Sequence, residues 1–137
     1  MVRYLLDTSV VHRLADTAVL QRVRDLPEGG RYTCTPVVLE VGFSARTAVD
    51  HQGRVGRLMT GMQWLPMTEQ IERRAIEVQG LLADRGQHRS ARLADLLIAA
   101  IAEAHGATVL HYDADFDQIA AVTGQPCQWV VTRGSVS

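Results

Sequence analysis

The sequence contains no lysine, so all 14 of its basic residues are arginine. This absence excludes a P-loop nucleotide site, a Schiff-base enzyme and a receiver domain, because each depends on a lysine side chain. The formal net charge is −1, so the chain also lacks the excess positive charge with which many proteins bind nucleic acid. Contact with nucleic acid would therefore need local arginines, metal ions at an acidic site, or both.

Only two cysteines are present, Cys34 and Cys127, and they are far apart in the sequence. They match neither a zinc ligand set nor a Cys-x-x-Cys redox pair, and we expect both to pack as small apolar side chains. No segment approaches the roughly 20 apolar residues of a membrane helix, and the first residues lack the pattern of a signal peptide. We therefore expect a soluble, cytoplasmic protein with one domain over residues 1–137.

Short apolar runs alternate with segments of helical periodicity along the chain. The apolar runs predict strands at residues 2–6, 32–34, 64–67, 108–111 and 129–132. The periodic segments predict helices at 9–26, with a break near Asp16, and at 36–46, 50–62, 69–85, 92–105 and 115–122. This alternation is typical of the α/β class, with a parallel sheet that helices cover on both faces.

Three acidic residues follow predicted strands. Asp7 directly follows the first strand, Glu40 lies in the first turns after the second, and Asp113 follows the strand after the most apolar helix. Parallel sheets bind ligands beyond the carboxyl ends of their strands, so we expect these side chains to meet at one edge. Taken alone, Asp7 could be a helix cap and Glu40 a solvated helix residue, although the neighbours of Glu40 are apolar.

Further acidic residues lie in the second half of the chain. Asp95 stands immediately before an apolar run in a helix that we expect to be buried, where an unpaired carboxylate is costly. Asp113, Asp115 and Asp117 alternate at the start of another helix, and one of them is expected to be its N-cap. Clustered carboxylates repel one another unless a cation neutralises them. Because all the ligands would be oxygen atoms, Mg²⁺ or Mn²⁺ suits this cluster better than zinc.

Four segments, in this order, resemble the PIN domain and, more closely, the VapC toxins of bacterial toxin–antitoxin pairs. They are Leu-Leu-Asp-Thr-Ser at 5–9, Pro-Val-Val-Leu-Glu at 36–40, Arg-Leu-Ala-Asp-Leu-Leu-Ile-Ala-Ala at 92–100 and His-Tyr-Asp-Ala-Asp-Phe at 111–116. The resemblance implies a three-layer α/β/α sandwich around a short, mainly parallel sheet. It also implies an endoribonuclease that depends on Mg²⁺ or Mn²⁺, with one or two ions per site, and hydrolyses phosphodiester bonds in a tRNA or ribosomal RNA loop.

The resemblance also implies which residues act. Asp7, Glu40, Asp95 and Asp113 match the acidic residues of the family that carry catalysis and bind the metal. Asp115 matches a further acidic residue that binds the metal, although it could instead be only a helix cap.

Other positions near the acidic residues match the family less closely. Ser9 matches a hydroxyl position near the metal site, whereas His111 stands where the family often has threonine or serine, so no hydroxyl role is expected there. Arg85, Arg89 and Arg92 precede the most apolar helix and are candidates for phosphate contacts, because a guanidinium can donate two hydrogen bonds to a phosphate. The alternative is that these arginines are only solvated. Aromatic residues make up 5% of the chain, so we do not expect an extended platform for base stacking.

Partners follow from the same resemblance. It implies RNA as the substrate, a cognate VapB-type antitoxin that blocks the site, a second copy of the toxin in a homodimer, and no membrane. We expect the surfaces for protein partners on the helices predicted at 9–26 and 36–46, because both hold more apolar residues than one buried stripe needs.

Two other kinds of protein are alternatives: a calcium-binding protein and a PIN-like module that does not cleave RNA. Asp113, Asp115 and Asp117 have the spacing of a calcium-binding EF-hand loop, but Gln118 and Gly124 stand where that loop requires glycine and glutamate. An EF-hand is therefore excluded. The remaining alternative is a PIN-like module that binds RNA or a protein partner without cleaving RNA.

Overall fold

The computed structural model describes residues 1–137 and contains one five-stranded sheet. The strands are β1 (Tyr4–Leu6), β2 (Arg31–Thr33), β3 (Gln63–Trp64), β4 (Thr108–His111) and β5 (Cys127–Trp129). They lie in the order β3-β2-β1-β4-β5, and every neighbouring pair is parallel. The expectation of a short parallel sheet is confirmed.

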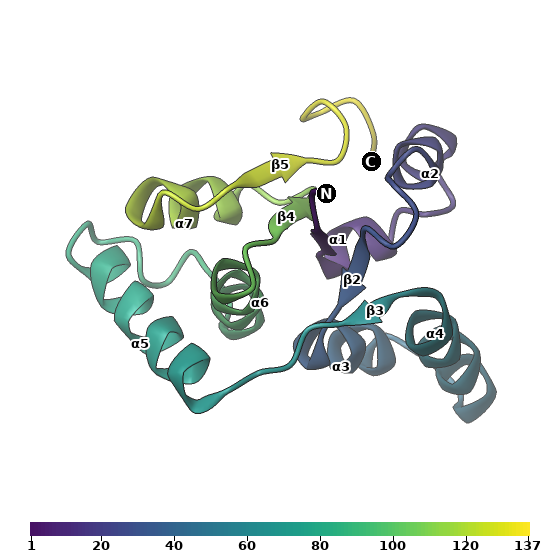
Figure 1. Cartoon of the computed structure of the whole chain (residues 1–137), viewed down its shortest axis with the longest axis horizontal. Helices are drawn as coiled ribbons and strands as arrows, with labels where there is room; N and C mark the ends of the chain where they lie inside the picture. Colours follow the sequence, from purple (N-terminus) through teal and green to yellow (C-terminus); the bar gives the residue numbers. More distant parts are fainter.

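Helices cover both faces of this sheet. They are α1 (Thr8–Val11), α2 (Thr17–Arg24), α3 (Thr35–Phe43), α4 (Ala48–Gly61), α5 (Glu69–Ala83), α6 (Leu93–Ala104) and α7 (Asp115–Thr123). In Figure 1, α2 lies on one side of the central strands, and α3, α5 and α6 lie on the other. None of the helices combines the length and the apolar composition that crossing a membrane requires.

The alternation of side chains along the two central strands creates two cores. Leu5 of β1 and Val109 of β4 belong to a cluster of 21 buried residues that also draws on α3, α5, α6 and α7. Their neighbours Leu6 and Leu110 point to the other face and join a cluster of 7 buried residues that draws on α1 and α2. Successive strand residues face opposite sides of a sheet, so two apolar neighbours in a strand require a helix layer on each side. The α/β/α sandwich is therefore confirmed.

The helix predicted over residues 9–26 is two helices in the structure, α1 and α2. Asp16 lies at the break and is the N-cap of α2. Its carboxylate accepts hydrogen bonds from the backbone N–H groups of Ala18 and Val19, at 2.9 and 3.2 Å. These amides have no partner within the helix, and an aspartate cap satisfies them. The predicted break near Asp16 is confirmed.

Both outer strands differ from the prediction. The strand predicted at 64–67 comprises only Gln63 and Trp64, because Pro66 has no N–H with which to continue the ladder. The strand predicted at 129–132 instead ends at Trp129. Trp129 pairs with His111, the last residue of β4, so the length of the neighbouring strand sets the end of β5. The second correction reflects pairing across the sheet, which a local apolar pattern does not contain.

The two cysteines pack as the sequence predicted. Cys34 is completely buried in the larger core, and Cys127 packs against that core. Burial raises the pKa of each thiol to about 12, so neither forms a reactive thiolate at neutral pH.

The order of the strands reverses between β1 and β4. From β1 the chain proceeds to β2 and β3 on one side, and it then returns to β4 and β5 on the other. Asp7 follows β1, and Asp113 lies two residues after β4. Ligands of parallel α/β sheets bind at such a point. The fold therefore places these two carboxylates at the edge where a site is expected.

Candidate active site

A cavity of about 850 Å³ opens beyond the carboxyl ends of β1 and β4. Four of the five predicted acidic residues line it: Asp7, Glu40, Asp95 and Asp113. They come from the turn after β1, from α3, from α6 and from the loop after β4, so the tertiary fold gathers them from four separate segments.

Asp7 is held by its own turn and is only 3% exposed. Its Oδ2 accepts hydrogen bonds from the backbone N–H and the hydroxyl of Ser9, at 3.0 and 2.5 Å. The Ser9 hydroxyl in turn accepts the backbone N–H of Tyr112, at 2.9 Å, and so ties the turn to the end of β4. Burial raises the pKa of Asp7, and the nearby charges of Glu40 and Asp113 add to this effect. Ser9 thus fixes one oxygen of Asp7 and leaves the other free.

That other oxygen, Asp7 Oδ1, is buried and has no hydrogen-bond partner within the chain. A buried carboxylate oxygen without a partner is costly. A cation is the kind of ligand that removes this cost, and it would also oppose the charges of the neighbouring acidic residues.

Glu40 is oriented by a residue that the sequence did not single out. The hydroxyl of Thr8 donates a hydrogen bond to Glu40 Oε1, at 2.6 Å. Thr8 directly follows Asp7 and begins α1, whereas Glu40 is on α3, so this contact joins two helices at the cavity. The signal in the sequence was the Asp-Thr-Ser triplet at 7–9, in which both hydroxyls turn out to hold carboxylates.

Asp95 lies in the first turn of α6 and is only 2% exposed. Its Oδ2 accepts the backbone N–H of Arg92 at 3.1 Å, which satisfies an amide at the start of the helix. Burial raises the pKa of Asp95 to about 7, and the charges of Asp7 and Asp113 contribute in the same direction. At neutral pH this carboxyl therefore retains a proton much of the time unless a cation displaces it.

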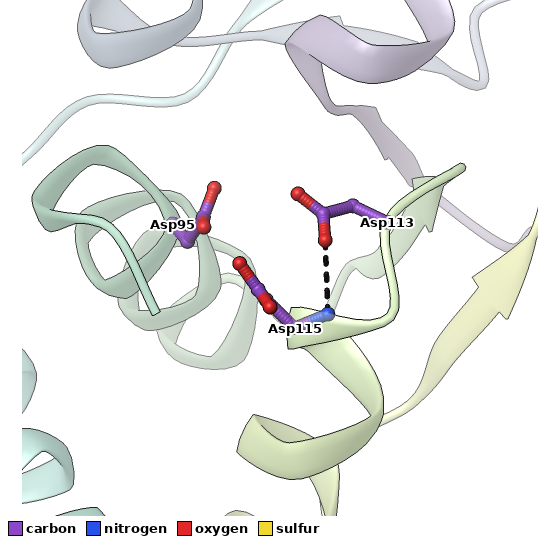
Figure 2. A group of neighbouring side chains, drawn as sticks. All are labelled: Asp95, Asp113 and Asp115. Carbon is purple, nitrogen blue, oxygen red and sulfur yellow. Dashed lines mark hydrogen bonds between the residues drawn. The ribbon is translucent and has the colours of Figure 1, made fainter. Parts of the chain in front are cut away.

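Three carboxylates converge directly, as Figure 2 shows: Asp95 from α6, Asp113 from the loop after β4 and Asp115 from the start of α7. One oxygen of each lies within 4.8 Å of the others. Asp113 Oδ1 also accepts the backbone N–H of Asp115, at 2.9 Å, while Asp115 faces the cluster. The N-cap of α7 is Ala114, so the expectation that one of the three aspartates takes this position is wrong. Burial, and then the charge of Asp113, raises the pKa of Asp115. This convergence of oxygen ligands suits a divalent cation.

His111, where the family often has a hydroxyl, also orients Asp113. Its Nδ1 accepts the backbone N–H of Asp113 at 3.2 Å. The ring is completely buried between Phe116 and Trp129, with centroids 5.1 and 5.0 Å away, and burial lowers its pKa to about 4. The imidazole is therefore neutral near pH 7, and its Nδ1 takes the place of a hydroxyl as hydrogen-bond acceptor.

The three predicted arginines occupy different positions. Arg92 lines the cavity, and its Nη2 lies 3.3 Å from Asp113 Oδ2 while its side chain remains 70% exposed. Arg85 and Arg89 are exposed and do not line the cavity. Of the three, only Arg92 is close enough to contact a phosphate beside the acidic residues.

Comparisons with known proteins agree with this geometry. The PIN domain family matches residues 4–122 of the chain. The chain is 49% identical over 136 residues to Ribonuclease VapC51 of Mycobacterium tuberculosis, covering 98% of each protein. It is 42% identical over 134 residues to Ribonuclease VapC21 of the same species, covering 97% of each.

Solved structures show a similar fold at lower sequence identity. VapBC2 from Rickettsia felis, bound to a DNA fragment from its promoter, is similar with a TM-score of 0.76 and 16% identity, over 93% of this chain and 98% of the other. Mycobacterium tuberculosis VapC20, described as a sarcin-ricin loop cleaving toxin, has a TM-score of 0.64 and 19% identity, over 83% and 92% of the two chains. Both similarities cover most of each chain.

Proposed function

The chain belongs to the PIN-domain family, within which its relatives are VapC ribonucleases, and from this premise we propose that it is a metal-dependent endoribonuclease toxin controlled by a VapB-type antitoxin. The observation that carries the proposal is the meeting of four carboxylates from four segments in one cavity. A stable fold does not need such a meeting, because buried like charges oppose folding. We therefore attribute the cluster to function.

We propose that Mg²⁺ or Mn²⁺ binds at this cluster. Asp7, Asp95, Asp113 and Asp115 would hold it directly, and Glu40 would complete the site from α3. The buried, unpartnered Oδ1 of Asp7 and the converging oxygens of the other three aspartates fit an ion with oxygen ligands. Bound there, the cation supplies Lewis acidity toward the phosphate and lowers the pKa of water.

In the proposed reaction, water attacks the phosphorus of an RNA phosphodiester in line with the leaving ribose oxygen. A P–O bond forms to the water oxygen, the P–O bond to the leaving oxygen breaks, and the proton released by the water reaches the leaving oxygen through solvent. Ser9 and Thr8 keep the carboxylates of Asp7 and Glu40 aimed into the cavity. The exposed guanidinium of Arg92 contacts the phosphate and opposes the charge that develops on it. No side chain forms a covalent bond to the substrate.

We propose that the antitoxin contacts the apolar rim of the same cavity. Leu39 and Phe43 of α3 line it and are 66% and 92% exposed. Large exposed apolar side chains at the mouth of a site mark a surface for a partner, and a partner seated there would block access to RNA. A homodimer remains part of this proposal, and we place the protein in the cytoplasm, where tRNA and ribosomal RNA are found.

A cleavage assay tests the proposed function. Purified protein, freed of any antitoxin, is incubated with total bacterial RNA while Mg²⁺ or Mn²⁺ is titrated, and the cleaved ends are mapped. We expect discrete cleavage sites that depend on the ion and disappear with EDTA. If RNA is bound but never cleaved at any concentration of either ion, the chain is instead a PIN-like binding module.

A further inference from the structure

The end of the chain builds one wall of the acidic cavity. Trp129 of β5, together with Arg133 and Gly134 beyond it, lines the same space as the catalytic carboxylates, and so does Tyr112. This wall differs from the apolar rim of α3 because it combines aromatic rings with guanidinium groups. The proposed reaction does not use these side chains.

A network of hydrogen bonds holds the wall in place. The Tyr112 hydroxyl donates to the carbonyl of Val136 at 2.8 Å, and it accepts the backbone N–H groups of Gly134 and Val136 at 2.8 and 3.2 Å. Arg13 lies over the Tyr112 ring, 4.7 Å from its centroid, and donates to the carbonyls of Ser9 and Ser137 at 2.7 and 2.9 Å. Tyr112 and Arg13 are therefore occupied in anchoring the chain end.

Trp129 and Arg133 take no part in this hydrogen-bond network. The Trp129 ring packs edge-on against Tyr112, at 5.3 Å between centroids, and its indole N–H donates to Asp117 at 3.2 Å. The Arg133 guanidinium lies 5.4 Å from the centroid of the indole ring. Arg133 is exposed and makes no ion pair with any acidic residue. The indole is therefore held in place by Tyr112 and Asp117, and the exposed guanidinium beside it has no acidic partner.

We propose that Trp129 and Arg133 form a subsite for the RNA nucleotide next to the scissile phosphate, an inference that rests on the proposed ribonuclease function. The base stacks on the Trp129 ring in place of the Arg133 guanidinium, which contacts the adjoining phosphate instead. Aromatic rings with nearby arginines bind single-stranded RNA in this way with little preference for sequence. The acidic floor repels RNA, so RNA binding needs cations beside it, and Arg92 and Arg133 both line the cavity.

Tryptophan fluorescence can detect the stacking directly. The chain has two tryptophans, and Trp64 lies on β3 outside the cavity, so a Trp64→Phe variant reports on Trp129 alone. An added Asp95→Asn substitution should slow cleavage enough for the titration to be completed. A short single-stranded RNA of mixed sequence should quench the emission to saturation, whereas an abasic ribose-phosphate chain of equal length should not. Equal quenching by both, or no quenching while labelled RNA is bound, overturns the stacking.

Dissociation constants for RNA then separate the contribution of Trp129 from that of Arg133. With labelled RNA, Trp129→Leu should raise the Kd about tenfold, and Trp129→Phe should raise it less, because the smaller ring still stacks. Arg133→Ala should make the dependence of log Kd on log salt concentration shallower by about 0.7, the value for one lost phosphate contact on a single strand. Arg24→Ala is the matched control, because Arg24 is exposed on α2, outside the cavity, and carries the same charge.

The outcomes distinguish this subsite from the proposed function. If the protein cleaves RNA with Mg²⁺ or Mn²⁺ while Trp129→Phe, Trp129→Leu and Arg133→Ala bind RNA as the Arg24→Ala control does, the subsite is wrong and the nuclease stands. If the unmodified protein neither binds nor cleaves RNA, both proposals fail together. Trp129→Phe and Arg133→Ala keep the test decisive even if Trp129→Leu does not fold, since Arg133 is on the surface.

Discussion

The acidic cluster has two halves that are held in different ways: Asp7 and Glu40 receive hydrogen bonds from neutral hydroxyls, whereas Asp95, Asp113 and Asp115 crowd together beside one guanidinium. We call them the hydroxyl-held pair and the crowded triad. A hydroxyl fixes the direction of a carboxylate without changing the charge of the site. Crowded carboxylates instead have an energy that depends on protons and cations. In the proposed function, the pair therefore fixes the geometry of the site, and the repulsion within the triad favours binding of a metal ion.

Replacing one carboxylate of the triad should have the largest effect. Asp95→Asn keeps an oxygen for the backbone N–H of Arg92 but removes a charge from the cluster. We expect cleavage to fall by roughly a hundredfold to a thousandfold, the usual range when one preorganised electrostatic group is lost. Initial rates on total RNA at a fixed Mn²⁺ concentration measure it. Asp84→Asn is the control, because Asp84 is exposed at the end of α5, and a folded Asp95→Asn protein that cleaves at the rate of this control would refute the assignment.

The stability of the metal-free protein should fall as the pH rises. The pKa of Asp95 is raised to about 7 in the folded chain, against an ordinary value of about 4. Between these values the folded state binds more protons than the unfolded state, so a rise in pH destabilises it. In EDTA we expect the Tm to be lower at pH 8 than at pH 5, by at least about 3 °C.

Two additions make this pH experiment specific. Asp95→Asn should flatten the fall in Tm, because the titrating group is gone. Mg²⁺ or Mn²⁺ should raise the Tm of the unmodified protein more at pH 8 than at pH 5, because protons compete with the cation for the same oxygens. A Tm that rises with pH in EDTA would show that burying the charged triad does not destabilise the metal-free protein.

Removing the hydroxyls of the other half should have a smaller effect. Ser9→Ala deletes the hydroxyl that donates to Asp7 and leaves the backbone N–H of Tyr112 without its acceptor. We therefore expect cleavage to fall about tenfold to a hundredfold. Thr8→Val, which frees Glu40, should act in the same direction but less, because it orphans no other group. Metal titrations of cleavage should show a weaker apparent affinity in Ser9→Ala. Unchanged rates in both variants would mean that the hydroxyls do not position the pair.

The smallest effects should come from replacing the arginines near the predicted site. Arg92→Ala should reduce cleavage about tenfold, since one phosphate contact to a charged group is lost. Arg85→Ala and Arg89→Ala should change it less than about twofold, because an exposed charge outside the site acts only through screened long-range attraction. Cleavage rates of the three variants, measured over one series of salt concentrations, test these expected losses. Equal losses in all three would favour a continuous basic surface over a single phosphate contact.

The identity of the elements was predictable from local patterns, but the ends of the two outer strands were predicted wrongly. The break at Asp16 has a local cause, since a carboxylate caps the amides that follow it, and the sequence contains that signal. Pro66 is also a local signal for the end of β3, whereas the end of β5 depends on the length of the neighbouring strand β4, which no nearby residue encodes. Pairing partners come from distant parts of the chain, so their effect appears only once the sheet has formed.

The sequence by itself determined which side chains are proposed to carry the chemistry, because a carboxylate beside an apolar run is costly wherever the chain folds, as Asp7 and Asp95 illustrate. Only the tertiary structure decided how they are held. It paired Thr8 with Glu40 across 32 residues and joined the backbone N–H of Asp113 to His111 Nδ1. It also brought Trp129 and Arg133 to the wall of the same cavity. The physical reason is reach: a hydrogen bond needs atoms about 3 Å apart, and only the packed sheet brings distant segments that close.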